Sequence, residues 1–159
     1  MPAVVAPFAP PAVGTSAPDF TLASTSGEQV TLSALRGRRV LLAFFPLAFT
    51  NTCTTELCAF TDDYDAFASE DVLVLPISVD SVPTLKEFKA KHGMRVHLLS
   101  DFRREASRAY GVLLEPAYFS TRAYFLVDAE GAVRWMHVED NPGLRRENAE
   151  ILAAVRSAG

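Results

Sequence analysis

The chain contains two cysteines, Cys53 and Cys58, and these residues have the clearest capacity for covalent chemistry. A deprotonated cysteine is a strong nucleophile and can pass through reversible oxidation states. Two cysteines are too few for a disulfide scaffold or for a zinc site made only of thiolates. Their close spacing favours redox chemistry, and a buried, unreactive thiol is the alternative that the counts alone leave open.

The surroundings of Cys53 indicate how its sulfur is activated. Cys53 lies in the first turn of a predicted helix, where free backbone N–H groups and the helix dipole favour a thiolate. Full ionisation raises the reactive fraction only about thirtyfold, about 2 kcal/mol, so a fast reaction also needs donors aimed at the transition state. Thr50, one turn upstream, offers a hydroxyl. A cation is also expected, and the local sequence does not select one of the arginines.

The elements that position Cys53 are a buried strand and a helix. Residues 40–45 form a continuous apolar run that ends at a proline, which predicts a central strand covered on both faces. From Cys53 to Phe67, apolar residues follow helical spacing, so one side of a helix faces the core. Residues 72–79 predict a second strand, placed at an edge or locally irregular because Pro76 cannot donate to a ladder.

The remaining segments complete an α/β pattern. The predicted elements are hairpins around residues 26–27 and 128–131, a helix that opens at residues 81–83 and runs through Lys91, and a last helix from Asn141 with Leu144 on its apolar face. This order is typical of an α/β domain with a mixed central sheet flanked by helices. We expect one such domain over residues 14–159, preceded by a flexible proline-rich arm over residues 1–13.

Composition argues against several kinds of partner. With 15 basic and 19 acidic residues the formal net charge is −4, which is unfavourable for binding nucleic acid or an anionic membrane. No apolar run reaches the ~18 residues that cross a bilayer. His92, His97 and His137 show no ligand spacing, so we expect no metal and no other cofactor. The N-terminus lacks the features of a secretion signal, which favours a cytoplasmic location.

One segment of the chain, Pro46-x-x-x-Thr50-x-x-Cys53, resembles the active-site motif of the peroxiredoxins, which lies between a core strand and a helix in that family. Three further segments resemble the family in the same order, namely Pro-Asp-Phe at 18–20, Ser-Val-Asp at 78–80, and 121–128, the strand that brings in an active-site arginine. The resemblance covers about residues 14–156. It implies a thioredoxin-like fold and a thiol-dependent peroxidase that reduces hydrogen peroxide and organic hydroperoxides.

The resemblance also implies a role for each residue of the site. Cys53 would attack the peroxide and become a sulfenic acid, Arg122 would favour the thiolate and stabilise charge on the peroxide, and Thr50 would hold peroxide and sulfur by hydrogen bonds. Pro46 would shield the sulfur from water, and Glu56 would pair with an arginine. The alternatives are a helix cap for Thr50, a surface strand position for Arg122, a strand end for Pro46 and an acidic first-turn residue for Glu56.

Cys58 is expected to complete the reaction cycle. On a straight helix the two Cα atoms lie roughly 8–9 Å apart, beyond the ~7 Å limit of a disulfide, so the helix must unwind locally before they bond. The spacing resembles that of the bacterioferritin-comigratory (PrxQ) peroxiredoxins, where the cysteine at this place resolves the sulfenic acid. Residues 44–50 and 99–102 resemble the one-cysteine, AhpE-like branch instead. We favour Cys58 as the resolving residue, and recycling of Cys53 by an external thiol is the alternative.

Two other functions are compatible with the same fold. A thiol–disulfide oxidoreductase normally carries Cys-x-x-Cys, which this chain lacks, and a non-catalytic binding module would not need the motif around Cys53. The expected partners are a hydroperoxide and, as reductant, thioredoxin or a low-molecular-weight thiol, and the resemblance allows a monomer or a homodimer. Tyr124 and Trp135 are interpreted as strand packing. The candidate apolar rim for organic substrates consists of Phe45, Leu47, Phe49 and Tyr118.

Overall fold

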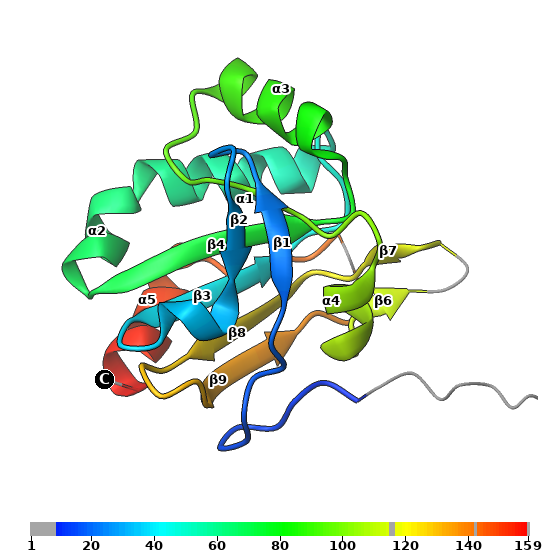
Figure 1. Ribbon diagram of the computed structural model, residues 1–159. Helices are drawn as coiled ribbons and strands as arrows, with labels where there is room; N and C mark the ends of the chain where they lie inside the picture. The colour runs from blue at the N-terminus through cyan, green and yellow to red at the C-terminus, as the bar shows by residue number, and fades with distance from the viewer. Residues whose placement is uncertain (1–8, 115–116, 142, 159) are drawn as a thin grey trace, which may run out of the picture.

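The computed structural model describes residues 9–114, 117–141 and 143–158, which form a sheet with helices packed on both faces (Figure 1). The strands are β1 (Thr21–Ser24), β2 (Gln29–Thr31), β3 (Arg39–Phe44), β4 (Val72–Ser78), β5 (Leu99–Ser100), β6 (Leu113–Leu114), β7 (Phe119–Ser120), β8 (Ala123–Val127) and β9 (Val133–Val138). The helices are η1 (Leu32–Leu35), α1 (Asn51–Asp62), α2 (Tyr64–Ser69), α3 (Val82–His92), α4 (Glu105–Ala109) and α5 (Asn148–Ala158). Of the arm expected over residues 1–13, residues 1–8 lie outside this description.

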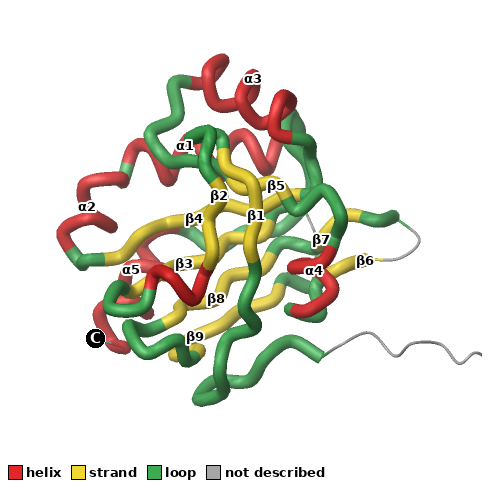
Figure 2. The backbone as a smooth tube through the Cα atoms, in the orientation of Figure 1, coloured by secondary structure: helices red, strands yellow, loops and turns green. Residues whose placement is uncertain are grey.

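Within the described chain, the main sheet has the strand order β2-β1-β5-β4-β3-β8-β9, and β6 pairs with β7 separately. β3 is parallel to β4 on one side and antiparallel to β8 on the other. Figure 2 shows these strands crossing the molecule side by side, with the connecting loops at their ends. The mixed sheet and the hairpins β1–β2 and β8–β9 confirm the predicted α/β pattern.

β3 is buried on both faces, as its apolar run predicts. Leu41 and Ala43 belong to one core with residues of α1, α2, α3 and α5. Val40, Leu42 and Phe44 belong to a second core with residues of η1, α4 and β1. This division follows from the strand itself, because successive side chains point to opposite faces of a sheet. The helix that carries the first cysteine therefore packs on the first of these faces.

The prediction of an edge position for residues 72–79 is wrong for the end of the strand, where β4 lies between β3 and β5. β5 pairs only with Ile77 and Ser78. Pro76 pairs with Ala43 of β3 and precedes the short stretch in which β4 has a strand on each side. A residue without an N–H group is tolerated where only one side of a strand must be hydrogen bonded.

The last helix begins later than predicted. α5 starts at Asn148 and not near Asn141, and Leu144 is 50% exposed instead of lying on the buried face of the helix. The Asn141 side chain accepts a hydrogen bond from the backbone N–H of Gly143 at 2.7 Å, and Leu144 N–H donates to the Asn141 carbonyl at 3.0 Å. The chain therefore makes a turn here, and Arg146 N–H is left to donate to a side chain of the sheet.

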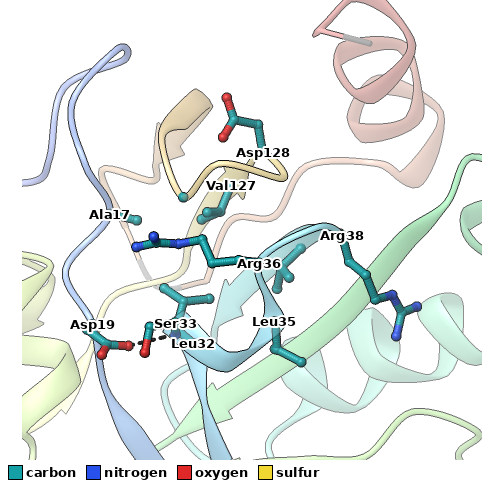
Figure 3. A pocket seen from close by; sticks show the side chains of 11 residues that line it. Ala17, Asp19, Leu32, Ser33, Leu35, Arg36, Arg38, Val127 and Asp128 are labelled. Carbon is teal, nitrogen blue, oxygen red and sulfur yellow. Dashed lines mark hydrogen bonds between the residues drawn. The ribbon is translucent and has the colours of Figure 1, made fainter.

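Arg36 directly follows η1 and lies near the turn between β8 and β9. A small pocket lies between η1 and this turn (Figure 3). Gly37 N–H donates to the Ala129 carbonyl at 2.8 Å. The φ angle of Gly131 is +89°, a conformation that favours glycine, and the Arg36 side chain lies against this glycine. The pocket lies at the start of β3 and contains neither cysteine.

Candidate active site

The loop between β3 and α1 places Cys53 at the end of β3 that is opposite to the turn between β8 and β9. Phe49 adopts a left-handed backbone conformation, with a φ angle of 67°, and turns the chain just before the helix. Thr50 is the N-terminal cap residue, and its carbonyl accepts the Thr54 N–H at 2.8 Å. Cys53 is the third residue of α1 and only 1% exposed. The predicted position at a helix start is confirmed.

A carboxylate at the end of β4 fixes this loop. Asp80 Oδ2 accepts hydrogen bonds from the Ala48 N–H at 2.8 Å and from the Ser78 hydroxyl at 2.7 Å. The Ser100 hydroxyl in turn donates to the Asp80 carbonyl at 2.6 Å. Because charge-assisted hydrogen bonds are stronger than neutral ones, Asp80 ties the loop that precedes α1 to the end of the neighbouring strand.

Arg122 lies immediately before β8 and reaches across to the cysteine. One guanidinium nitrogen donates to Cys53 Sγ at 3.0 Å, and the other donates to Glu56 Oε1 at 2.7 Å. The arginine and glutamate side chains are 1% and 0% exposed, which excludes the alternative of a surface strand position for Arg122. A buried pair of this kind keeps its geometry, because displacing one partner leaves an uncompensated charge.

Glu56 is held from the strand side by two residues. Tyr124 donates its hydroxyl hydrogen to Glu56 Oε2, and Arg122 occupies Oε1. Burial raises the pKa of Glu56, and the charge of Arg122 and the hydrogen bond from Tyr124 counter that rise. Burial also disfavours the charged Arg122, but Glu56 and Cys53 outweigh this and raise the pKa of Arg122 above its ordinary value. Glu56 is therefore a buried member of the site and not an exposed first-turn acid.

An open pocket of about 240 Å³ leads to the sulfur. It is lined by Pro46, Leu47, Thr50, Asn51, Thr52, Cys53, Phe119, Arg122 and Gly143. The structure thus brings Pro46, Thr50, Cys53 and Arg122 together around one opening, with Glu56 behind Arg122. Side chains from a loop, a helix start and a distant strand converge here, as expected of a catalytic centre.

The contacts of Thr50 and Pro46 bear on the two remaining alternatives, and the pocket lining bears on the predicted rim. The Thr50 hydroxyl donates to the Leu47 carbonyl at 2.8 Å and makes no side-chain cap to the helix. Pro46 follows the end of β3 and also lines the pocket. Of the four predicted rim residues, all within the described chain, Leu47 alone lines this opening. Phe45 belongs to the core, the Phe49 ring lies 4.9 Å from that of Phe88, and Tyr118 is exposed outside the pocket.

Cys58 lies further along α1 and is half-buried. It packs against the core that contains Cys53. Both cysteines are free, and the two are not at disulfide distance, as the helix geometry predicts. Burial raises the pKa of the Cys58 thiol, and the nearby Asp62 carboxylate raises it further. In this conformation Cys58 is held as a protonated thiol.

The sequence analysis missed Tyr124 and Asp80 as members of the site. The ring of Tyr124 does lie near Trp135, with centroids 6.3 Å apart, but its hydroxyl contacts Glu56. One signal was available, because alternate residues of a strand share a face and Tyr124 is two residues after Arg122. For Asp80 the resemblance identified the segment but assigned it no task.

Two larger hollows lie elsewhere in the described chain. The larger hollows elsewhere contain neither cysteine. Over residues 9–114, 117–141 and 143–158, no group of three or more His, Cys, Asp or Glu side chains is placed to hold a metal ion. In the same ranges, no helix is long and apolar enough to span a membrane.

Known proteins share both the sequence and the fold. The AhpC/TSA family model matches residues 13–136. Alkyl hydroperoxide reductase E of Mycobacterium tuberculosis (strain ATCC 25618 / H37Rv) is 42% identical over 149 residues, which cover 90% of this chain and 97% of that protein. The putative peroxiredoxin bcp of Coxiella burnetii (strain RSA 493 / Nine Mile phase I) is 38% identical over 127 residues, 76% of this chain and 84% of that protein.

A solved structure leads to the same result. The reduced 2-Cys peroxiredoxin of Plasmodium vivax matches with a TM-score of 0.85 and 34% identity, covering 92% of this chain and 81% of that one. This match confirms the thioredoxin-like fold. With a family match over most of its length, the chain belongs to the AhpC/TSA family and is a peroxiredoxin-type thiol peroxidase.

Proposed function

We propose that Cys53 is the residue that attacks the peroxide and that the enzyme reduces both hydrogen peroxide and organic hydroperoxides. The observation that carries this is the 3.0 Å hydrogen bond from Arg122 to the Cys53 sulfur at an open pocket. A guanidinium so close stabilises the thiolate, which is the nucleophilic form. The buried pairing with Glu56 keeps the guanidinium in place.

The proposed step is a displacement at oxygen. The Cys53 thiolate attacks the hydroxyl oxygen of the hydroperoxide in line with the O–O bond, so an S–O bond forms while the O–O bond breaks. The bonding pair leaves on the second oxygen, which takes up a proton and departs as an alcohol or water. Sulfur is oxidised to sulfenic acid and the peroxide is reduced. Arg122 and Thr50 are the donors proposed to stabilise charge on the two oxygens. The Thr50 hydroxyl turns from the Leu47 carbonyl to the bound peroxide for this purpose, and Pro46 limits access of water.

The pocket wall supports the wider substrate class. Pro46, Leu47 and Phe119 place apolar surface beside the sulfur. An alkyl group gains free energy when it leaves water for such a surface. Second-order rate constants for hydrogen peroxide and an alkyl hydroperoxide test this, and an alkyl hydroperoxide that reacts far more slowly than hydrogen peroxide contradicts it.

Replacing the attacking sulfur tests the assignment directly. Cys53→Ser should reduce peroxide consumption to the background rate while the far-ultraviolet circular dichroism stays unchanged. Cys58→Ser is the matched control on the same helix and should keep the first, sulfenic-acid-forming step. Peroxide consumption by Cys53→Ser at the unmodified rate contradicts the proposal.

We further propose that Cys58 resolves the sulfenic acid. The start of α1 supports local unwinding, because it has no side-chain cap and no acidic residue in its first turn. The threonines beside Cys53 are also weak helix formers. Glu56, bonded to Arg122 and Tyr124, anchors the second turn, so the first turn can open alone. Cys58 then displaces hydroxide from the Cys53 sulfur, and one disulfide and one water result.

Mass analysis of the protein after one equivalent of peroxide tests this step. The expected product is an internal Cys53–Cys58 disulfide, formed within one chain. A stable sulfenic acid on Cys53 with Cys58 still free contradicts resolution by Cys58 and favours a one-cysteine cycle with an external thiol. Cys58→Ser shows what the unresolved product looks like in the same measurement.

The enzyme acts on a peroxide and is restored by a thiol. For that thiol, thioredoxin and a low-molecular-weight thiol are the proposed candidates, and coupled assays with each one distinguish them. We also propose a cytoplasmic location, supported by the two free thiols. A single catalytic domain over residues 14–159 is part of the same proposal, and sedimentation distinguishes the monomer from the homodimer.

A further inference from the structure

The buried hydroxyl of Tyr124 makes two hydrogen bonds next to the site. It donates to Glu56 Oε2 and accepts the backbone N–H of Arg146 at 3.0 Å. Tyr124 has no exposed surface. A buried hydroxyl with both a donor and an acceptor partner has a fixed direction, because neither bond can be exchanged for one to water.

Glu56 depends on that hydroxyl. Its carboxylate is completely buried, with Oε1 bonded to Arg122 at 2.7 Å and Oε2 bonded to Tyr124. A buried carboxylate needs donors on both oxygens, since the cost of leaving a charged acceptor without a partner is large. Tyr124 is the donor to Oε2, while Arg122 bonds to Oε1 and directs its other terminal nitrogen to Cys53.

Residues of β9 and of the segment before α5 surround Tyr124. Its ring lies near those of Trp135 and His137 on β9, with centroid distances of 6.3 and 6.5 Å. The Arg146 side chain bonds to Glu139 at 2.8 Å, and the Glu139 backbone N–H donates to the Arg122 carbonyl at 2.9 Å. The contacts of Tyr124 therefore lead back to the arginine that bonds the sulfur.

We propose that Tyr124 is a positioning residue for peroxide reduction: its hydroxyl fixes Glu56, and Glu56 fixes Arg122 against Cys53. The proposal rests on the function proposed above for Cys53. Tyr124 is not among the residues that line the pocket, and its hydroxyl bonds to Glu56 and Arg146, so it acts through the carboxylate.

The consequence is a defined pH dependence. Arg122, just before β8, and Tyr124 on β8 bond to Glu56, and Arg145 in the segment before α5 adds a positive charge. Cys53, on α1 like Glu56, bonds to the same guanidinium. His137, which stacks on Tyr124, is paired with Glu139 at 3.2 Å. Burial raises the pKa of Glu56, and Tyr124 is among the groups that lower it. Without the hydroxyl, Glu56 takes up a proton at a higher pH as the solution is acidified.

The test is Tyr124→Phe, with Tyr110→Phe as the matched control. Tyr110 is equally buried, and its hydroxyl donates to the Pro18 carbonyl at 2.6 Å in the second core, remote from Cys53. Tyr124→Phe should lower kcat/KM for peroxide about tenfold, the scale of one lost hydrogen bond to a charge, and move the acid limb of the pH profile to higher pH. Tyr110→Phe should leave both unchanged. Equal changes in the two variants overturn the proposal.

Glu56→Gln completes the test as a double-mutant cycle. A glutamine does not titrate, so adding Tyr124→Phe to Glu56→Gln should produce no further shift of the acid limb. A shift that persists in the double variant overturns the proposal. If Cys53→Ser abolishes activity while Tyr124→Phe behaves like the unmodified enzyme, only the role of Tyr124 is lost. If Cys53→Ser remains active, the proposed function itself fails.

A second variant keeps the test decisive if Tyr124→Phe does not fold. Placing 3-fluorotyrosine at position 124 keeps the ring and the hydroxyl but makes the phenol a stronger donor. The acid limb should then move to lower pH, the opposite direction from Tyr124→Phe. An unchanged profile with 3-fluorotyrosine overturns the proposal.

Discussion

The two sides of Cys53 differ in how firmly they are built. We call Arg122, Glu56 and Tyr124 the buried side, and the loop 46–50 the loop side. The three side chains of the buried side are joined by hydrogen bonds and have at most 1% exposure. On the loop side, Phe49 and Thr50 are exposed, and the main tie is one backbone N–H bonded to Asp80.

This difference indicates that the two sides of Cys53 have different roles. In the proposed mechanism the buried side supplies the donors for the attack on peroxide, and it cannot move without exposing a charge to an apolar core. The loop side and the uncapped first turn of α1 can open at a smaller cost in free energy. In the proposed cycle, such a site holds the sulfur for the attack on peroxide and releases it for resolution by Cys58.

The largest effect is expected from breaking the buried side. Arg122→Met leaves Glu56 buried without its cation, so the free energy of unfolding should fall by about 3–5 kcal/mol. Peroxide reduction should fall by at least about a hundredfold, since a donor at the reacting atoms is lost. Urea unfolding and stopped-flow peroxide kinetics measure the two quantities.

Its matched control removes both charges. Arg122→Met with Glu56→Gln should recover much of the stability and none of the activity, because the pair is then replaced by uncharged groups. Recovery of activity in this double variant would show that the guanidinium is not needed at the sulfur.

The next effect concerns the hydroxyl on the loop side. Thr50→Val keeps the shape of the side chain and removes the donor, so kcat/KM should fall about a hundredfold, the low end of the loss of one transition-state donor. Thr50→Ser keeps the hydroxyl and should stay close to the unmodified rate. Because Thr50 is exposed, neither change should greatly alter the urea midpoint. Equal rates for valine and serine contradict a role for the hydroxyl.

A smaller effect is expected from loosening the loop. Asp80→Ala removes the acceptor of the Ala48 N–H, so stability should fall by about 1–3 kcal/mol and the rate about tenfold. Asp101→Ala is the comparison, because that buried carboxylate accepts the N–H groups of Ala106 and Ser107 at α4. It should cost similar stability with little loss of rate. If both variants lose rate equally, the loop is not specifically held by Asp80.

The smallest effect is a pH shift at Cys58. Since burial and Asp62 raise the pKa of this thiol, alkylation of Cys58 in a Cys53→Ser background should need a higher pH in the native protein than in urea. The folded state holds this proton more tightly, so its contribution to stability is present below the ordinary thiol range and is lost as the pH rises. Identical alkylation profiles in the two states contradict this environment for Cys58.

Much of the local structure around the sulfur could be predicted from the sequence. The alternation of β3 between two cores and the helix start at Cys53 both follow from short-range patterns. The break between α1 and α2 after Asp62 interrupts the predicted continuous stripe to Phe67, yet Phe67 is still buried.

The long-range parts of the site could not be derived in this way. Arg122 is separated from Cys53 by 69 positions and from Glu56 by 66, and only the resemblance selected it among the arginines. Tyr124 was read as packing because its type fits a buried strand equally well without a polar partner. The position of β4 inside the sheet also depends on strand pairing between distant segments, which Pro76 alone cannot decide.

One minor contact gains importance if the first turn of α1 opens. The Thr52 hydroxyl donates to the Gly143 carbonyl at 3.4 Å, and Gly143 lines the pocket beside Cys53. Unwinding the turn would separate these two residues and alter the outline of the molecule at the pocket mouth. The oxidised protein would then present its reductant with a different surface from the one that the peroxide contacts. The first turn of α1 would in this way separate binding of the peroxide from binding of the reductant.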